Sequence, residues 1–205
     1  MSNFYTLKSD IKGKEYNEIA QGFLQEKKSK FISYIFSINT KEDAEKYINE
    51  IKNNNKEARH VVYIYSYLDN NNLNVKFSDD GEPQGTGTRA IYELMTKECL
   101  TNICIVIVRY FGGILLGAGP LSRAYLNSAK EAIDKCEKTE IYNYIDLEFE
   151  VSYNNYNSVK YIIDNYQDRE IIVKNTDFGD NICIKLQVVD FEVENFKSKI
   201  ESYML

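Results

Sequence analysis

Residues 102–125 read NICIVIVRYFGGILLGAGPLSRAY and contain the longest aliphatic run of the chain. The run 103–108 is too short to cross a bilayer, and it has the near-continuous apolar character of a strand covered on both faces. Four glycines follow before Pro120, a residue that suits the first turn of a helix, which we expect over 120–135. The stretch therefore predicts a buried strand, a glycine-rich loop and a long helix.

The segments before this stretch predict the rest of an α+β domain. The β-branched and aromatic content of 30–38 and 60–67 favours strands. Between them, Thr40 is a suitable N-cap for a helix, and Asp43 in place of the usual Glu predicts a partial capping box. The other elements expected here are strands at 22–25 and 73–77 and a helix over 88–98.

The last third of the chain has its own pattern and its own charge. Residues 1–137 carry 18 Lys and Arg and 18 Asp and Glu, whereas 138–205 carry 7 and 13, so the net charge of −6 lies in the last third. This asymmetry predicts two domains, 1–137 and 138–205. Strands expected at 140–153, 170–174 and 181–189, with helices around 156–163 and 191–204, give the order βαββα.

Composition narrows the class of protein. Hydrophobic residues make up 43% and aromatic residues 13%, which is enough for a packed core. The four cysteines contain no C-x-x-C pair and His60 is the single histidine, so we expect buried thiols and no Cys/His zinc site. We also expect no cofactor. The N-terminus lacks the layout of a signal peptide, so we expect a cytoplasmic protein that does not enter the membrane.

A first candidate site is the acidic turn Ser78-Asp79-Asp80-Gly81-Glu82-Pro83. Three carboxylates in four residues can bind a hard cation or serve as acid and base. The same residues are also turn formers, because Asp side chains before Gly bond their own backbone. The sequence leaves both interpretations open.

A second candidate is Gly85-Thr86-Gly87-Thr88-Arg89, which leads directly into a predicted helix. Free N–H groups, glycines and a nearby Arg can hold an anion. The alternative is an ordinary glycine-rich helix entry, since no P-loop Lys-Ser/Thr closes the motif.

A third candidate is the end of the buried strand, where Arg109, Tyr110 and Phe111 precede the glycines. Arg123 lies in the first turn of the following helix, where a cation is unfavourable and needs an anion or the acidic turn as a partner. His60 stands among apolar strand residues, so it is either a hydrogen-bonded wall residue or a catalytic group.

Taken together, these motifs resemble the YigZ/IMPACT family in order and spacing, from about residue 29 to residue 132. The resemblance rests on Ala58-Arg59-His60, on the stretches 78–86 and 109–119, and on Arg123-Ala124-Tyr125. It implies a βαβ-type N-terminal domain like domain IV of elongation factor G, and a ferredoxin-like C-terminal domain. It also implies a role in translation, because eukaryotic relatives regulate it and RNA or ribosome binding is the usual suggestion for bacterial members.

Three functions follow as hypotheses. The first is a translation-associated binding protein that contacts RNA, the ribosome or a translation-regulator protein. The second is a metal-assisted enzyme on a phosphate- or carboxylate-bearing small molecule. The third is a protein–protein regulator whose polar motif braces a rigid surface. The expected binding residues are Arg59, His60, Ser78, Asp79, Asp80, Glu82, Thr86, Arg109, Tyr110 and Arg123.

Overall fold

The computed structural model describes residues 4–8, 18–69, 72–166 and 170–205. The chain divides into unit 1, Met1–Ile141, and unit 2, Tyr142–Leu205, each with its own apolar core. The division falls later than the expected one after residue 137. The reason is that β7 (Glu137–Glu140) pairs antiparallel with β1 (Tyr5–Lys8) of unit 1, a pairing that the charge pattern did not indicate.

Unit 1 is built on a five-stranded sheet in the order β2-β3-β6-β4-β5, with antiparallel neighbours throughout. β3 and β4 both run antiparallel to β6 and are joined by a helix, so they form a βαβ unit split by β6. β6 is buried along almost its whole length, which confirms the strand predicted from the aliphatic run. The strands are β2 (Glu18–Glu26), β3 (Ser29–Ser37), β4 (His60–Asp69), β5 (Asn72–Ser78) and β6 (Ile103–Tyr110).

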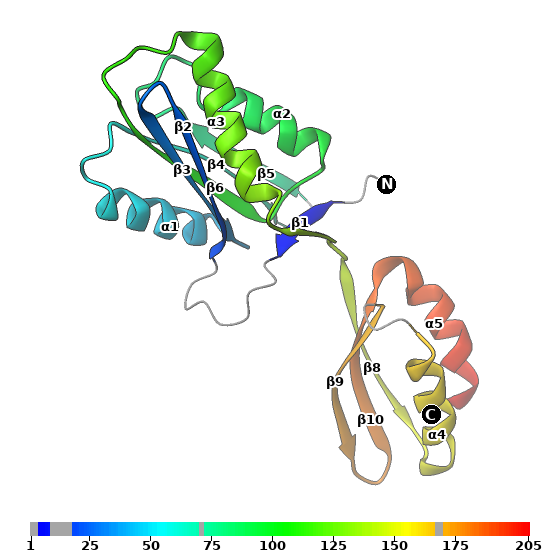
Figure 1. Ribbon diagram of the computed structural model, residues 1–205. Helices are drawn as coiled ribbons and strands as arrows, with labels where there is room; N and C mark the ends of the chain where they lie inside the picture. The colour runs from blue at the N-terminus through cyan, green and yellow to red at the C-terminus, as the bar shows by residue number, and fades with distance from the viewer. Residues whose placement is uncertain (1–3, 9–17, 70–71, 167–169) are drawn as a thin grey trace. The chain divides into compact units, whose positions relative to one another are not determined.

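Helices cover both faces of this sheet. α1 (Lys41–Asn54) lies on one face, and α2 (Arg89–Lys97) and α3 (Ala118–Ile133) lie on the other (Figure 1). At the start of α1 the capping box is complete, because the shorter Asp43 side chain still accepts the N–H of Thr40 at 3.1 Å. The expectation of a partial capping box was therefore wrong.

α3 begins earlier than the position of Pro120 suggests. Gly117 is the N-cap, with φ of 77°, so Pro120 is the third residue of the helix. A proline is tolerated there because the first-turn N–H groups have no partner within the helix. The glycine-rich loop therefore ends two residues sooner than expected and leaves the N–H groups of Ala118 and Gly119 at the helix terminus.

Unit 2 has the expected element order. It consists of β8 (Tyr144–Val151), α4 (Tyr153–Asp164), β9 (Ile171–Phe178), β10 (Ile182–Val189) and α5 (Val193–Ile200), with sheet order β8-β10-β9. The strand expected over 140–153 corresponds to β8, which is shorter at both ends. The helix expected over 191–204 is α-helical only in α5, which is flanked by 3₁₀ turns at Asp190–Glu192 and Glu201–Tyr203.

The structure supports an α+β protein with several antiparallel sheets. The finer likenesses, to domain IV of elongation factor G and to a ferredoxin-like domain, stay predictions. In the part of the chain that the structure describes, no helix is both long and apolar enough to span a membrane.

Candidate functional site: an arginine-lined pocket

The centre of the site is Arg109, near the end of β6. In the sheet register Arg109 lies opposite Phe31 of β3 and His60 of β4, so the three side chains share one face. Its guanidinium carbon lies 5.5 Å from the centroid of the Phe31 ring. Its Nη1 donates to Oε1 of Glu82 at 2.5 Å. The sheet therefore places a cation beneath the acidic turn.

Glu82 collects three partners in a buried position. Besides Arg109, it accepts a hydrogen bond from the Tyr125 hydroxyl at 2.7 Å, and its Oε2 lies 3.7 Å from Nε2 of His60. Arg109 is 5% exposed and Tyr125 is fully buried. Burial first, and the Glu82 carboxylate second, raise the pKa of the Tyr125 phenol well above its usual value. Tyr125 thus stays a hydrogen-bond donor to Glu82.

The orientation of His60 follows from its other ring nitrogen. Nδ1 lies 2.8 Å from the backbone carbonyl oxygen of Asp80. A carbonyl only accepts, so Nδ1 carries the hydrogen and Nε2 faces Glu82. This bond makes His60 a hydrogen-bonded wall residue of the site, as one of the two sequence interpretations expected.

Asp79 organises the loop that follows it. Its carboxylate accepts the N–H groups of Gly85 at 2.7 Å and of Gly87 and Thr88 at 3.0 Å, together with the Thr88 hydroxyl at 3.0 Å. A side chain at Gly87 would press on Val62 and on Asp79 itself. The glycine-threonine motif therefore closes around an internal carboxylate, which occupies the place that an external anion would take.

Asp80 points to the opposite side and ties the loop to two other elements. It accepts the backbone N–H of Val61 at 2.7 Å and the Lys52 ammonium at 3.2 Å. Its own N–H donates to the Ser78 hydroxyl at 3.2 Å, and it adopts a φ of 46°. Thr86 completes the turn by donating its hydroxyl to the carbonyl of Pro83 at 2.6 Å.

The three carboxylates of the acidic turn thus serve three different sets of internal donors. Asp79 holds the loop, Asp80 holds β4 and α1, and Glu82 holds the Arg109 network. Among the described residues no three His, Cys, Asp or Glu side chains gather closely enough to hold a metal ion. The arrangement suits the turn-forming interpretation of the motif better than the cation-binding one.

A pocket of about 410 Å³ opens beside this network. One wall is polar and comes from Arg59, His60, Glu82 and Arg109, and the rest is mainly apolar. The Nε atom of Arg109 is buried and has no hydrogen-bond partner within the described part of the chain. The remaining lining residues are Gly81, Pro83, Phe111, Leu115, Leu116, Gly117, Ala118 and Leu121.

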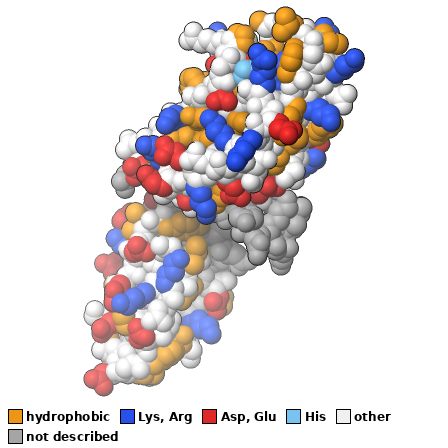
Figure 2. Space-filling view, turned by 90° about the vertical axis from the view of Figure 1, so that its left-hand side faces the viewer, with side chains coloured by type: hydrophobic (Ala, Val, Ile, Leu, Met, Phe, Trp, Pro, Cys, Tyr) orange, Lys and Arg blue, Asp and Glu red, His pale blue; other side chains and the backbone are white. Residues whose placement is uncertain are grey.

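The mouth of the pocket combines charge with exposed apolar surface. The guanidinium carbons of Arg59 and Arg109 both lie 5.6 Å from the centroid of the Phe111 ring. Leu115 is 84% exposed. In Figure 2 the single histidine is visible next to basic and hydrophobic side chains. No carboxylate of the described residues lies within ion-pair distance of Arg59.

The structure brings together only part of the expected binding set. Arg59, His60, Glu82 and Arg109 line the pocket, while Ser78, Asp79, Asp80 and Thr86 build the loop behind it. Tyr110 lies on the other face of the sheet and donates its hydroxyl to Asn55 at 2.7 Å. Arg123 lines a separate hollow with Glu26 and Lys27. The apolar lining from Leu115, Leu116 and Leu121 was missed, although the aliphatic residues inside a glycine-rich loop signalled it.

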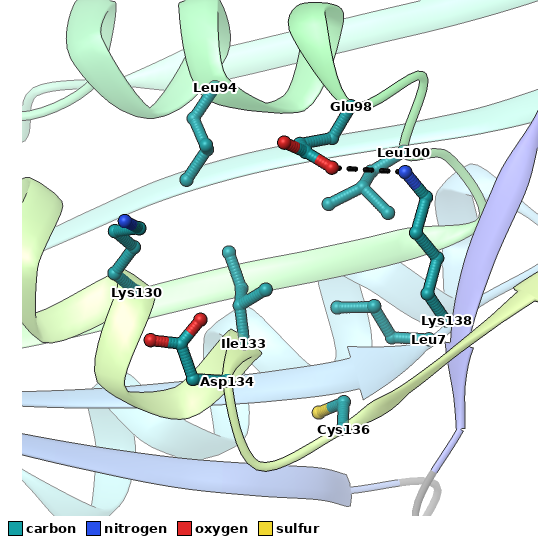
Figure 3. Close-up of a pocket in the computed structure, with 9 residues that line it drawn as sticks. All are labelled: Leu7, Leu94, Glu98, Leu100, Lys130, Ile133, Asp134, Cys136 and Lys138. Carbon is teal, nitrogen blue, oxygen red and sulfur yellow. Dashed lines mark hydrogen bonds and ion pairs between the residues drawn. The ribbon is translucent and has the colours of Figure 1, made fainter.

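A second pocket, of about 340 Å³, lies where α2 and α3 end (Figure 3). Leu7, Leu94, Leu100 and Ile133 contribute its apolar lining. Lys138 is already engaged, with Glu98 at 3.0 Å and over the Tyr5 ring at 4.4 Å. Burial raises the pKa of the Cys136 thiol to about 11, so this cysteine is a poor nucleophile. The Arg109 pocket is the better candidate site.

Comparison with known proteins agrees with the motifs. The profile of the Impact N-terminal domain matches residues 27–133. An IMPACT family member from Haemophilus influenzae is 31% identical over 175 residues, which cover 85% of this chain and 84% of that protein. The IMPACT family member YigZ of Escherichia coli is 28% identical over 86% of either chain.

Two further comparisons are shorter or more distant. The IMPACT family member YvyE of Bacillus subtilis is 39% identical over 107 residues, about half of either chain. A crystal structure described as that of an hypothetical protein shares the fold, with a TM-score of 0.65 and 21% identity over 98% of this chain and 93% of that one. On the profile match and the relative from Haemophilus influenzae, the chain belongs to the IMPACT family.

Proposed function

We propose that the chain is a translation-associated binding protein that contacts RNA, in the ribosome or free, through the Arg109 pocket. The observation that carries the proposal is the mouth of the pocket, where the exposed Arg59 lies over Phe111 and no carboxylate in the described part of the chain neutralises it. Membership of the IMPACT family supports the translation part, since the resemblance implies that eukaryotic relatives regulate translation.

The charges around the pocket favour an anion. Arg59 and Arg109 supply two cations against the single carboxylate of Glu82. Gly117 and Ala118, at the N-terminus of the 16-residue helix α3, line the same pocket, and no side chain of the described residues caps that terminus. Free N–H groups and the helix dipole attract phosphate. The apolar walls and the exposed Phe111 suit the nucleoside that accompanies each phosphate in RNA.

The enzyme alternative receives less support. Metal-assisted chemistry on a small molecule requires carboxylates that converge on one point. Asp79 and Asp80 instead accept backbone N–H groups on opposite sides of the loop, and Glu82 is bonded to Arg109 and Tyr125. Redirecting any of them toward a metal would leave buried donors without partners.

The test is cosedimentation of the purified chain with ribosomal particles at low and moderate salt. We expect pelleting that falls steeply with salt, because phosphate contacts release counterions. Arg59→Gln removes the exposed cation without disturbing the buried network, and we expect it to weaken pelleting about tenfold.

The matched control is Arg89→Gln, an exposed arginine of the same unit that is paired with Glu93 outside the pocket. We expect the control to pellet like the wild type. If both variants lost pelleting equally, the interaction would depend on the overall charge of the chain and not on the pocket. Pelleting that is independent of salt, or unchanged in Arg59→Gln, would contradict the proposal.

A further inference from the structure

β5 is an open edge of the unit 1 sheet. Among the residues that the structure describes it pairs with β4 only, at the end of the order β2-β3-β6-β4-β5. Leu73, Val75 and Phe77 alternate along it and are 47%, 37% and 54% exposed. Alternate residues of a strand point to the same face, so they form one apolar row.

The row extends the face that α2 and α3 cover. Phe77 lies opposite Ile64 of β4, which is buried in the core beneath those helices. At the edge the only aromatic neighbour of Phe77 among the described residues is Tyr92 of α2, at 6.2 Å between ring centroids, and Tyr92 is itself 41% exposed. The helices thus stop short of β5 and leave this part of the apolar face to solvent.

The other edge of the same sheet is protected. In β2 the backbone N–H of Phe23 donates to Glu131 of α3 at 2.5 Å, and the carbonyl of Gln21 accepts from Lys135 at 2.9 Å. β2 also carries an irregularity of register between Glu18 and Ala20. Such devices keep edge strands from pairing with other chains.

β5 lacks these devices. Its pairing with β4 is regular, it contains no proline, and no side chain from another element bonds the backbone of its apolar row within the described residues. Its one charge, Lys76, points to the opposite face and lies 3.6 Å from Glu45. An edge of this kind is a template for another strand.

The sequence of β5 fits a second copy of itself. In an antiparallel pair centred on Val75, each Leu73 lies opposite Phe77 of the other copy and the two Val75 residues face each other. Lys76 then lies opposite Asn74, so no like charges meet. Centring the pair on Lys76 would set two ammonium groups against each other, which is unfavourable. The register centred on Val75 is therefore favoured over the one centred on Lys76.

We propose that two chains associate through β5, paired antiparallel about a two-fold axis at Val75, so that two five-stranded sheets become one. The axis is perpendicular to the sheet, so both apolar rows lie on the same side, between the two α2 helices. The interface is isologous and closes at a dimer, because both chains use the same edge, β5, and each copy of that edge is covered by the other.

The test is sedimentation equilibrium of the full chain from about 1 to about 100 μM. We expect a monomer–dimer equilibrium for the wild type. Val75→Lys sets two ammonium groups at the axis and should weaken the dimer at least about tenfold. The matched control is Val173→Lys, a valine that is 47% exposed in β9, an edge strand of unit 2. The control should dimerise like the wild type.

A second variant fixes the register. Val75→Cys places two thiols opposite each other at the axis, and mild oxidation should give a disulfide-linked dimer. The disulfide-linked dimer is detected on a gel run without reductant. Val173→Cys and the wild type, which has four free cysteines, are the controls. A wild type that stays monomeric at the highest concentration overturns the proposal and leaves the edge to a different partner. A dimer that survives Val75→Lys overturns it as well.

Discussion

The Arg109 guanidinium donates to the Glu82 carboxylate at 2.5 Å, and both side chains are almost fully buried. The two residues belong to different parts of unit 1, the end of β6 and the turn after β5. Their contact fixes the acidic turn over the sheet and defines one wall of the pocket. Because each charge has the other as its main partner, the pair must be considered as a unit.

Removing one member of this pair should destabilise unit 1 strongly. We expect Glu82→Ala to cost about 3–5 kcal/mol, because Arg109 and the Tyr125 hydroxyl would remain buried without an acceptor. Urea unfolding followed by circular dichroism measures the loss. The control is the double variant Glu82→Leu/Arg109→Met, which removes both charges and should recover most of the stability. A double variant as unstable as the single one would contradict this account.

Gly112 and its neighbour Gly113 should differ sharply in their tolerance of alanine. A Cβ at Gly112 would overlap the backbone of Lys28, whereas a Cβ at Gly113 meets nothing within 4 Å. We expect Gly112→Ala to cost about 3 kcal/mol through steric overlap. Gly113→Ala should cost only about 1 kcal/mol, because its φ of 84° is unfavourable for alanine. Thermal unfolding of the two variants decides the order, and equal losses would refute the steric argument.

Asp79 should stabilise the loop and should not take part in ligand binding. We expect Asp79→Ala to cost about 1.5–3 kcal/mol, since the N–H groups of Gly85, Gly87 and Thr88 lose a charged acceptor. Amide hydrogen exchange should rise at these three positions and stay unchanged in α1. If exchange there is unaffected, the carboxylate does not organise the loop.

The cap of α1 gives a pH-dependent contribution of known sign. The backbone N–H of Asn39 foremost, helped by Thr40, holds the pKa of Asp43 below its usual 3.8. A lowered pKa in the folded state gives stability that is complete above the ordinary carboxyl pKa and is lost as pH falls through the lowered one.

Asp43→Ala should therefore cost about 0.5–1 kcal/mol at pH 7, given the exposure of the group. The difference from the wild type should shrink below about pH 4. Thermal midpoints of both proteins across pH 7 to about 3 test this. Glu42→Ala is the control, an acidic residue of the same helical turn that is outside the capping box. A constant difference at all pH values would argue against the ionised cap.

Local patterns were sufficient to predict most elements of the fold. The aliphatic run predicted β6, because a strand covered on both faces needs apolar residues at every position. Local patterns did not predict the elements that depend on pairing with residues far away in the sequence. β1 and β7 have little apolar pattern of their own and exist because they pair with each other, so sequence reasoning missed both.

The site was predictable in its residue types but not in its geometry. Arg109, Glu82 and His60 were identified by their charge and motif, yet their mutual contacts depend on a register that no local pattern contains. Tyr110 was predicted as a site residue without considering that successive side chains of a strand point to opposite faces. Because Tyr110 follows Arg109 in the strand, it must face the other way. For Arg123 the unfavourable helix dipole predicted an anion or the acidic turn as partner, whereas the structure places it at a hollow near Lys27.

The position of β6 determines how slowly its backbone amides become exposed to solvent. β6 is hydrogen-bonded on both sides, to β3 and β4, and is covered on both faces, so its amides should be among the slowest in the chain to exchange with solvent. Arg109 is anchored in that slow segment, while Leu115 and Phe111 belong to an exposed loop. A ligand in the pocket would thus meet a preorganised wall and an adaptable one, and the entropy lost on binding would fall mainly on the loop.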